Sequence, residues 1–157
     1  RHGFIDRSGK EVVPVIYDHV DSVNRWLIRV QLNGKYGFFK GDLYYETWSA
    51  AGTVKYDDIG DFKNDRVRVQ VNGKWGFIDT LGEEVISLKY DEAGDFSDWR
   101  ARVKFAGKWG FIDVCGIEVI PAQYDEAEDF SNGWAKVKLN GQRGKINKAG
   151  NFYPDKK

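Results

Sequence analysis

The sequence predicts an all-β protein built from about four and a half tandem repeats of short antiparallel strands. A glycine recurs in similar surroundings, with steps of 34, 39, 34 and 34 residues, at Gly3, Gly37, Gly76, Gly110 and Gly144. A Tyr-Asp pair recurs in the same register, beginning at Tyr17, Tyr56, Tyr90 and Tyr124. No segment has convincing helical periodicity, so each unit of about 34 residues is expected to be a small antiparallel sheet.

The first part of one repeat predicts a β-hairpin. Residues 101–105 alternate between apolar and polar side chains, as a half-buried strand does. Ala106-Gly107 follows at the place where other copies have Asn-Gly, the strongest short signal for a two-residue type I′ turn. Residues 109–113 return as the second strand. Gly110 inside this strand indicates a bulge or a closely packed neighbour.

The rest of the repeat predicts a third strand and a connector. Residues 114–116 form a turn, and residues 118–120 form a third short strand that Pro121 ends. Residues 124–130 then carry the chain to the next unit. We therefore expect three strands and one irregular connector in each unit.

The alternation also predicts which side chains face the core. Repeated Trp and Tyr residues are expected to pack between units. The inward set comprises Ile28, Val30, Leu32, Val67, Val69, Val71, Ala101, Val103, Phe105, Ala135, Val137 and Leu139. Phe4, Phe38, Phe77, Phe111, Ile5, Ile78, Ile112 and Ile146 continue this pattern in the following strand.

The repeats are expected to form one domain over residues 1–157. The units run roughly over residues 4–37, 38–76, 77–110 and 111–144, with a partial unit over 145–157. Both ends of the chain lie near the recurrent glycine strand, so the sheets are expected to wind either into a curved array or into a closed barrel-like body.

The recurrent Trp-Gly pair resembles the signature of the bacterial WG-containing repeat (WG β-repeat) family. Trp75-Gly76 and Trp109-Gly110 carry the signature in full, and Tyr36-Gly37 is a conservative copy. His2-Gly3 and Arg143-Gly144 lack the aromatic residue. The resemblance covers the whole chain. It implies short β-strands and a role as a binding or accessory module, and it supplies no catalytic residues.

Composition excludes several classes of protein. Lys and Arg number 24, and so do Asp and Glu, so the chain lacks the net basic charge of a dedicated nucleic-acid binder. A single cysteine excludes an intrachain disulfide and fits a cytoplasmic protein without excluding export. No apolar run approaches the roughly 20 residues that a membrane-spanning helix needs. The chain begins at Arg1 inside a repeat, which indicates a fragment of a longer protein.

The balanced charge is segregated along each repeat. Outward positions of the strands are basic, and the connectors are acidic, as in residues 125–129. Solvated surface charges that protect strand edges account for this pattern, and a basic groove for an anionic polymer is the functional alternative. We expect no binding to nucleic acid at physiological salt, because the acidic connectors offset the basic field.

No catalytic, cofactor or metal motif stands out. His2, His19 and Cys115 are the only histidines and the only thiol, and nothing in the register brings them together. The acidic connectors offer too few oxygen ligands for calcium, and no phosphate-binding glycine loop or zinc spacing occurs. We interpret the chain as non-catalytic and without a cofactor.

The candidate binding residues are aromatic side chains outside the regular pattern. The longer step falls between Phe39 and Tyr56, where the chain carries an aromatic-rich insertion. Insertions in repeat proteins map to loops, often on a functional face, although an elongated hairpin with its aromatics on the core is the alternative. A second set of tryptophans precedes the first strand of a unit and could form an aromatic rim. The candidates are Tyr44, Tyr45, Trp48, Trp26, Trp99 and Trp134.

Two functions follow from these residues. The first is a non-catalytic module that binds a protein or peptide, as an accessory part of a larger protein. The second is a module that binds carbohydrate or cell envelope, in which the same aromatic rings serve as stacking platforms.

Overall fold

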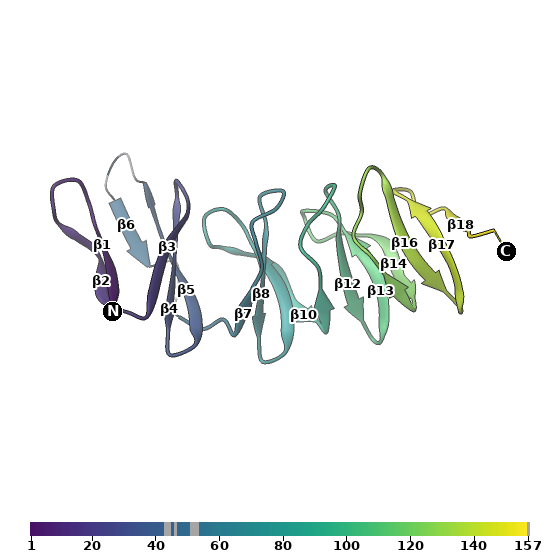
Figure 1. The fold of residues 1–157 in the computed structure, drawn as a ribbon, viewed down its shortest axis with the longest axis horizontal. Helices are drawn as coiled ribbons and strands as arrows, with labels where there is room; N and C mark the ends of the chain where they lie inside the picture. The colour runs from purple at the N-terminus through teal and green to yellow at the C-terminus, as the bar shows by residue number, and fades with distance from the viewer. Residues whose placement is uncertain (43–44, 46, 51–53, 157) are drawn as a thin grey trace.

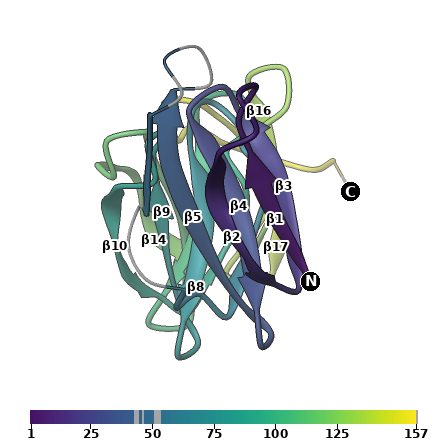
Figure 2. The same ribbon diagram turned by 90° about the vertical axis from the view of Figure 1, so that its left-hand side faces the viewer.

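The protein is a row of five antiparallel β-sheets. The computed structural model describes residues 1–42, 45, 47–50 and 54–156. The sheets follow one another along the longest axis, and the two termini lie at opposite ends of the row (Figure 1). Seen from the N-terminal end, the sheets lie behind one another (Figure 2). The open array is therefore the observed alternative, and the closed barrel-like body is not formed.

Four sheets have four strands each, and the first has two, which gives the predicted four and a half units. The half sheet consists of β1 (His2–Ile5) and β2 (Glu11–Tyr17). The first complete sheet consists of β3 (His19–Asn24), β4 (Leu27–Leu32), β5 (Lys35–Asp42) and β6 (Thr47–Ala50). The second consists of β7 (Asp58–Ile59), β8 (Val67–Val71), β9 (Lys74–Ile78) and β10 (Glu84–Tyr90). The third consists of β11 (Glu92–Ala93), β12 (Ala101–Phe105), β13 (Lys108–Ile112) and β14 (Glu118–Tyr124). The fourth consists of β15 (Glu126–Ala127), β16 (Trp134–Leu139), β17 (Gln142–Asn147) and β18 (Phe152–Pro154).

The expectation of three strands in each unit was wrong by one. The connector is not irregular throughout, because two of its residues pair with the next strand: Glu92 opposes Lys104, and Ala93 opposes Val103. Each of the four complete sheets is thus a four-stranded meander in which sequence neighbours are also spatial neighbours.

Turns at the two ends of the strands form two rims. The lower rim in Figure 1 holds the predicted two-residue hairpin tips, where Asn72 and Gly73 have φ values of 50° and 77°. Positive φ at both positions confirms the expected type I′ geometry. The upper rim holds the other fully described turns of the meanders. They lie at residues 25–26, 64–65, 98–99 and 132–133, and at residues 6–10, 79–83, 113–117 and 147–151.

The apolar cores lie between consecutive sheets. Phe111 on β13 faces the fourth sheet, where its ring meets Phe130 at 4.8 Å between centroids. Its neighbour Ile112 faces the second sheet and packs in the cluster that contains Phe77. Strand β13 therefore buries both faces, and stacking of the sheets supplies a core that one sheet could not form alone.

The predicted inward positions are largely buried, with two exceptions. Val67, Val69, Ala101 and Val103 are almost inaccessible to solvent, as expected. Phe105 is 51% exposed because it ends β12 beside a hairpin tip.

Ile5 is the other exception and is 63% exposed. Its counterparts Ile78, Ile112 and Ile146 are covered by the preceding sheet. The sheet that contains Ile5 is the first of the row, so no described sheet lies in front of it.

The recurrent glycine allows a bulged strand to cross close to it. Between β9 and β10, Trp75 opposes Tyr90 and Phe77 opposes Ile86, so two steps on β9 match four on β10. The extra residues arch over Gly76, where a Cβ atom would lie 2.4 Å from the carbonyl oxygen of Ile86. The prediction of a bulge with close packing at this glycine position is confirmed.

The recurrent Tyr-Asp pair fixes the lower rim. Tyr56 and Tyr124 are buried in the cores, and the aspartate after each makes two contacts. Asp125 Oδ2 accepts the Gly141 N–H of its own hairpin tip at 2.9 Å. Asp125 Oδ1 binds the Lys108 ammonium of the preceding sheet at 2.5 Å. Equivalent ion pairs join Lys35 to Asp57 and Lys74 to Asp91.

These aspartates predict a specific loss of stability in acid. The Lys35 ammonium, followed by the Asn72 N–H, lowers the pKa of Asp57. The Lys108 ammonium does the same for the pKa of Asp125. A carboxyl whose pKa is lower in the folded state than in the unfolded state stabilises the fold at pH values above its unfolded pKa of about 3.9. This contribution is lost as the pH falls through the lowered pKa of the folded state.

Replacing both aspartates with asparagine should therefore lower the melting temperature at neutral pH. The same double variant should lose less of its remaining stability than the wild type between about pH 5 and about pH 2. Melting temperatures measured over this range test the expectation, and parallel curves for the two proteins would contradict it.

Candidate functional site

The recurrent tryptophan is part of the junction between sheets. Trp75 is only 7% exposed, and the Arg68 guanidinium lies over its ring at 4.7 Å from the centroid. Arg68 Nε also pairs with Asp95 of the next sheet at 2.8 Å. The predicted packing of this tryptophan between units is confirmed, and it leaves Trp75 unavailable to a partner.

The segregated charges also follow from these junctions. Basic side chains of one sheet pair with acidic connector residues of the next, as Arg68 pairs with Asp95 and Arg102 with Asp129. Opposite charges meet across each of these junctions, so the basic strand faces of the inner sheets are not an open groove for an anionic polymer.

The aspartate that ends the Trp-Gly-Phe-Ile-Asp segment shapes the upper rim. Asp79 Oδ1 accepts the Leu81 and Glu83 backbone N–H groups at 2.9 and 3.0 Å. Asp113 caps the equivalent turn through Cys115 and Ile117. These carboxylates hold the turns in a fixed geometry, as side-chain caps of turns do.

More than half of the exposed large apolar side chains that the structure describes lie on or near the upper rim. A set of large hydrophobic residues lies exposed in or directly beside its turns: Trp26, Tyr45, Leu81, Trp99, Ile117, Trp134 and Tyr153. The lower rim carries exposed Phe105, and it is otherwise lined mainly by Asn-Gly hairpin tips and by the Lys-Asp ion pairs. Exposed apolar residues that cluster on one side of a protein mark an interaction surface.

Four of the six predicted aromatic residues lie exposed on this rim: Trp26, Tyr45, Trp99 and Trp134. Trp26 and Trp99 share one turn position in different sheets, as the sequence register predicted, and Trp134 begins β16 beside the equivalent turn. Tyr45 is 73% exposed. Trp48 is half-buried on β6 and packs against the core between the first two sheets. Tyr44 lies outside the described residues.

The insertion is in part an elongated hairpin. Strand β5 continues to Asp42, which opposes Thr47 of β6, and Gly41 opposes Trp48. The indole of Trp48 lies against Gly41, where a Cβ atom would come within 2.6 Å of the ring. One predicted aromatic therefore covers the sheet, and another, Tyr45, projects into solvent.

Trp26 and Trp48 meet at a cavity on the upper rim. The cavity has a volume of about 370 Å³, and Leu81 from the second sheet closes one side. Lys40 and Asp42 line it as well. Such a volume is at the lower end of the range of small-molecule sites.

Charged groups fix the walls of this cavity. Lys40 pairs with Glu83 at 2.5 Å, and Arg25 pairs with Asp42 at 3.5 Å. The Arg25 guanidinium also lies 4.5 Å from the centroid of the Trp26 ring. Leu81 was not among the residues predicted from the sequence, and an apolar residue at the exposed tip of an aspartate-capped turn was the signal that could have found it.

A second aromatic group lies further along the rim. Trp134 meets Tyr153 edge-on at 5.5 Å, and Lys145 lies over the Trp134 ring at 4.3 Å. Asp98 Oδ2 accepts the Gly133 N–H at 2.7 Å, which ties this group to the turn that carries Trp99. Lys148 and then the Gly133 N–H lower the pKa of Asp98, so this link is made by a carboxylate.

The backbone of Trp99 is unusual for a large side chain. Its φ is 62°, in the left-handed region, and its side chain is 53% exposed. The equivalent positions in the neighbouring sheets are Asp65 and Gly133. Bulky residues in the left-handed region are strained, and strained residues cluster at functional sites.

Comparison with protein families identifies the repeat. The family model described as "WG containing repeat" matches residues 3–36, 54–75, 75–109 and 109–142, which together make up most of the chain. The chain belongs to the WG containing repeat family. The matches to WG repeats leave out residues 37–53, so Trp48 and Tyr45 lie in a segment that the repeat pattern does not account for.

Other comparisons add little to the WG repeat assignment. No curated protein sequence matches the chain. Among solved structures, PorZ of Porphyromonas gingivalis, an essential bacterial surface component of the type-IX secretion system, is similar with a TM-score of 0.49 and 10% identity. The similarity covers 92% of this chain and 22% of PorZ, so the chain spans about a fifth of the length of that protein.

The described part of the WG repeats holds no cluster of metal-ligating side chains. In residues 1–42, 45, 47–50 and 54–156, no three His, Cys, Asp or Glu side chains are placed to hold a metal ion. His2 and His19 meet edge-on at 6.3 Å, whereas Cys115 lies exposed in a turn of the third sheet. No helix in the same residues is long and apolar enough to cross a membrane.

Proposed function

We propose that this WG-repeat chain is a non-catalytic module that binds an extended segment of a partner protein along the upper rim. The observation that carries the proposal is the gathering of exposed aromatic and aliphatic side chains on that rim. Aromatic anchors dominate the energetics of protein interfaces, and tryptophan is prominent among them. The cavity between Trp26 and Trp48 would receive one apolar side chain of the partner, and Trp99 and Trp134 would contact it further along.

A carbohydrate ligand is the second candidate function. The cavity that holds Trp26 and Trp48 is also lined by Thr47 and Ser49. Hydroxyl groups beside an indole offer hydrogen-bond partners to a sugar stacked on the ring. The same protein can be offered both classes of ligand.

The first test is selection of ligands on the immobilised chain. A phage library of random 12-residue peptides and a glycan array serve as probes. We expect peptides to be selected, and Trp26→Ala to weaken the best of them about 30-fold or more, as an interface hot spot does. Phe105→Ala is the matched control, because Phe105 is an exposed aromatic on the lower rim. Glycan binding without peptide binding would favour the second function, and equal effects of the two variants would contradict the rim proposal.

A second variant separates binding from stability. A left-handed backbone costs about 1–2 kcal/mol for a residue with a side chain, and glycine adds about 0.5–1 kcal/mol of chain entropy on unfolding. Trp99→Gly should therefore melt no lower than the wild type but bind the selected peptides less tightly. A clear drop in melting temperature would show that the Trp99 side chain supports the fold instead.

A further inference from the structure

At two junctions of the array, an acidic, extended segment crosses the face of the preceding sheet. The connector Asp125-Glu126-Ala127-Glu128-Asp129-Phe130 lies across the outer face of the third sheet. Arg102 Nε pairs with Asp129 at 2.9 Å, and Arg102 Nη1 donates to the Ala127 carbonyl oxygen at 2.7 Å. Phe130 then packs on Phe111.

The preceding junction uses the same contacts. Arg68 pairs with Asp95 at 2.8 Å and donates to the Ala93 carbonyl oxygen at 2.8 Å. Phe96 packs on Phe77 at 5.0 Å between ring centroids. A basic residue in the middle of a sheet therefore recognises a carboxylate and a backbone carbonyl of the segment that crosses it.

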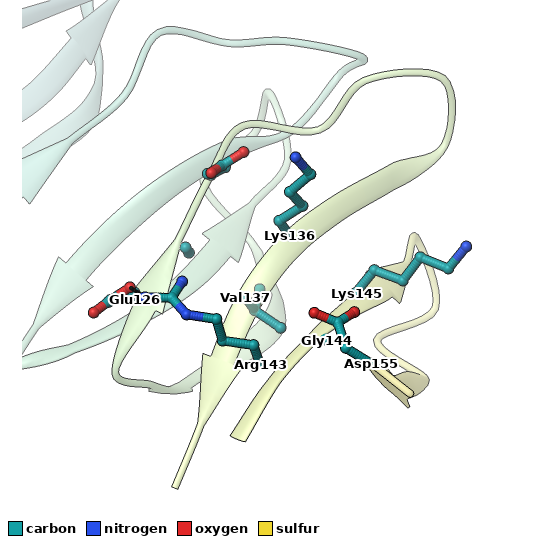
Figure 3. Close-up of a pocket in the computed structure, with 9 residues that line it drawn as sticks. Glu126, Lys136, Val137, Arg143, Gly144, Lys145 and Asp155 are labelled. Carbon is teal, nitrogen blue, oxygen red and sulfur yellow. Dashed lines mark ion pairs between the residues drawn. The ribbon is translucent and has the colours of Figure 1, made fainter. Parts of the chain in front are cut away.

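The outer face of the fourth sheet keeps the basic residues, and no sheet of the described chain covers it. Lys136 stands in the register of Arg102 and opposes Lys145. Arg143 stands in the register of Trp109, and it opposes Lys138. A cavity of about 490 Å³ opens on this face, lined by Lys136, Arg143, Lys145, Glu126, Glu128 and Asp155 (Figure 3).

Two residues of this face differ from their counterparts in the third sheet, and the difference changes which side chains the face can bind. At the third sheet the corresponding positions are Trp109 and Phe111, which accept the aromatic ring of the connector. Arg143 and Lys145 replace them, so cations stand where aromatic contacts were. A segment that crosses this face meets two further cations and less apolar surface than an inner connector does, and it also meets the carboxylates of the fourth sheet itself.

Three carboxylates already line this cavity: Glu126, Glu128 and Asp155. Glu126 pairs with Arg143 at 3.3 Å and with Lys138 at 3.5 Å, and Figure 3 shows Arg143 directed toward it. Glu128 stands in the register of Gly94. At Gly94 a Cβ atom would lie 2.8 Å from the Asp129 carboxylate, so the glycine leaves room for the incoming acid. The Glu128 side chain thus occupies part of the space that the carboxylate of a crossing segment takes at the Arg102 junction.

We propose that the outer face of β16 and β17 binds an acidic, extended segment of a partner protein, in the position that connectors take at the inner junctions. Lys136 would pair with a carboxylate of the segment, and Arg143 and Lys145 would attract further acidic residues. Charge complementarity and the matching register with the Arg102 junction carry the proposal. Lys145 also lies over the Trp134 ring, so this face adjoins one end of the upper rim, and the Trp26 and Lys136 variants distinguish the two proposals.

The probe is the chain's own connector. A fluorescent peptide with the sequence of residues 125–130 and blocked ends is titrated against the protein at low salt, and a peptide with Asn and Gln in place of its acids is compared. We expect the acidic peptide to bind, the neutral one not to bind, and the affinity to fall as salt is raised. Absence of binding by the acidic peptide at low salt, or equal binding of both peptides, would overturn the proposal.

Three variants locate the binding. Lys136→Glu should weaken the acidic peptide about three- to tenfold, the effect of reversing one exposed charge in an interface. Glu128→Gly should strengthen it, because this change restores the glycine of the inner junctions. Lys63→Glu is the control, since Lys63 is an exposed lysine of the second sheet. Equal losses for Lys136→Glu and Lys63→Glu, or weaker binding by Glu128→Gly, would show that the peptide does not bind this face.

Discussion

Replacing Phe111 with alanine is expected to lower the free energy of unfolding by about 3–5 kcal/mol, the usual cost of truncating a buried aromatic residue. Phe111 is fully buried between the third and fourth sheets, and its ring packs edge-on against Phe130. The cost rises with the volume of the cavity that remains after the surrounding sheets relax. Urea unfolding followed by tryptophan fluorescence measures the effect.

Phe105 provides the matched control for this prediction. It lies on the neighbouring strand of the same sheet and was also assigned to the core by the alternation of the sequence, but it is half exposed beside a hairpin tip. Phe105→Ala should change the free energy of unfolding by no more than about 0.5 kcal/mol. If Phe105→Ala lowers the free energy of unfolding as much as Phe111→Ala does, the apolar–polar alternation of the sequence identifies the core better than the burial seen in the stacked sheets.

The period of the sequence was enough to predict the architecture. The recurrence of a glycine and of a Tyr-Asp pair in one shared register predicted the number of units, and the Asn-Gly pairs predicted the hairpin tips. Gly110 predicted a bulge because a glycine weakens a strand interior and is typical of places where the backbone bulges or another chain segment comes close. These features are local to one repeat, so each copy repeats the same signal.

Features that depend on contacts between repeats were harder to predict. The short strands β7, β11 and β15 lie in acidic connectors whose composition resembles turns, and only pairing with the next strand makes them extended. Trp75 and Trp109 have the same local sequence, but Trp75 is buried and Trp109 only half-buried. The difference arises from the neighbouring sheets, which the motif itself does not describe.

The candidate site also combines residues that the sequence predicted with contacts that it could not predict. The sequence singled out Trp26, Trp48 and Trp99 because they break the repeat pattern. It could not bring Trp26 and Trp48 to one cavity, since that contact depends on the elongated hairpin of β5 and β6. It also missed Leu81, because an isolated leucine in a turn carries no periodic signal.

The expected effect of adding one methyl group at Gly76 tests the role of the recurrent glycine. The Cβ atom of Gly76→Ala would lie 2.4 Å from the Ile86 carbonyl oxygen and 2.9 Å from the Leu88 nitrogen. Both are backbone atoms of the bulged strand β10, so the bulge itself must move. We expect the free energy of unfolding to fall by about 1–3 kcal/mol or more, as overpacking of a closely packed site does.

Gly94→Ala is the comparison that decides whether backbone crowding is the cause. A Cβ atom at Gly94 would lie as close as 2.8 Å to neighbouring atoms, but these belong to the Arg102 and Asp129 side chains and not to the backbone, so rotation of side chains can relieve the crowding. Gly94→Ala should therefore cost less than Gly76→Ala in the same urea titration. If the two variants lose equal stability, the loss depends on how close the added Cβ atom lies to its neighbours and not on whether those neighbours are backbone atoms. If Gly76→Ala is the more stable of the two, the bulge does not require the glycine, and crowding by the backbone of β10 is not the reason for the Trp-Gly signature.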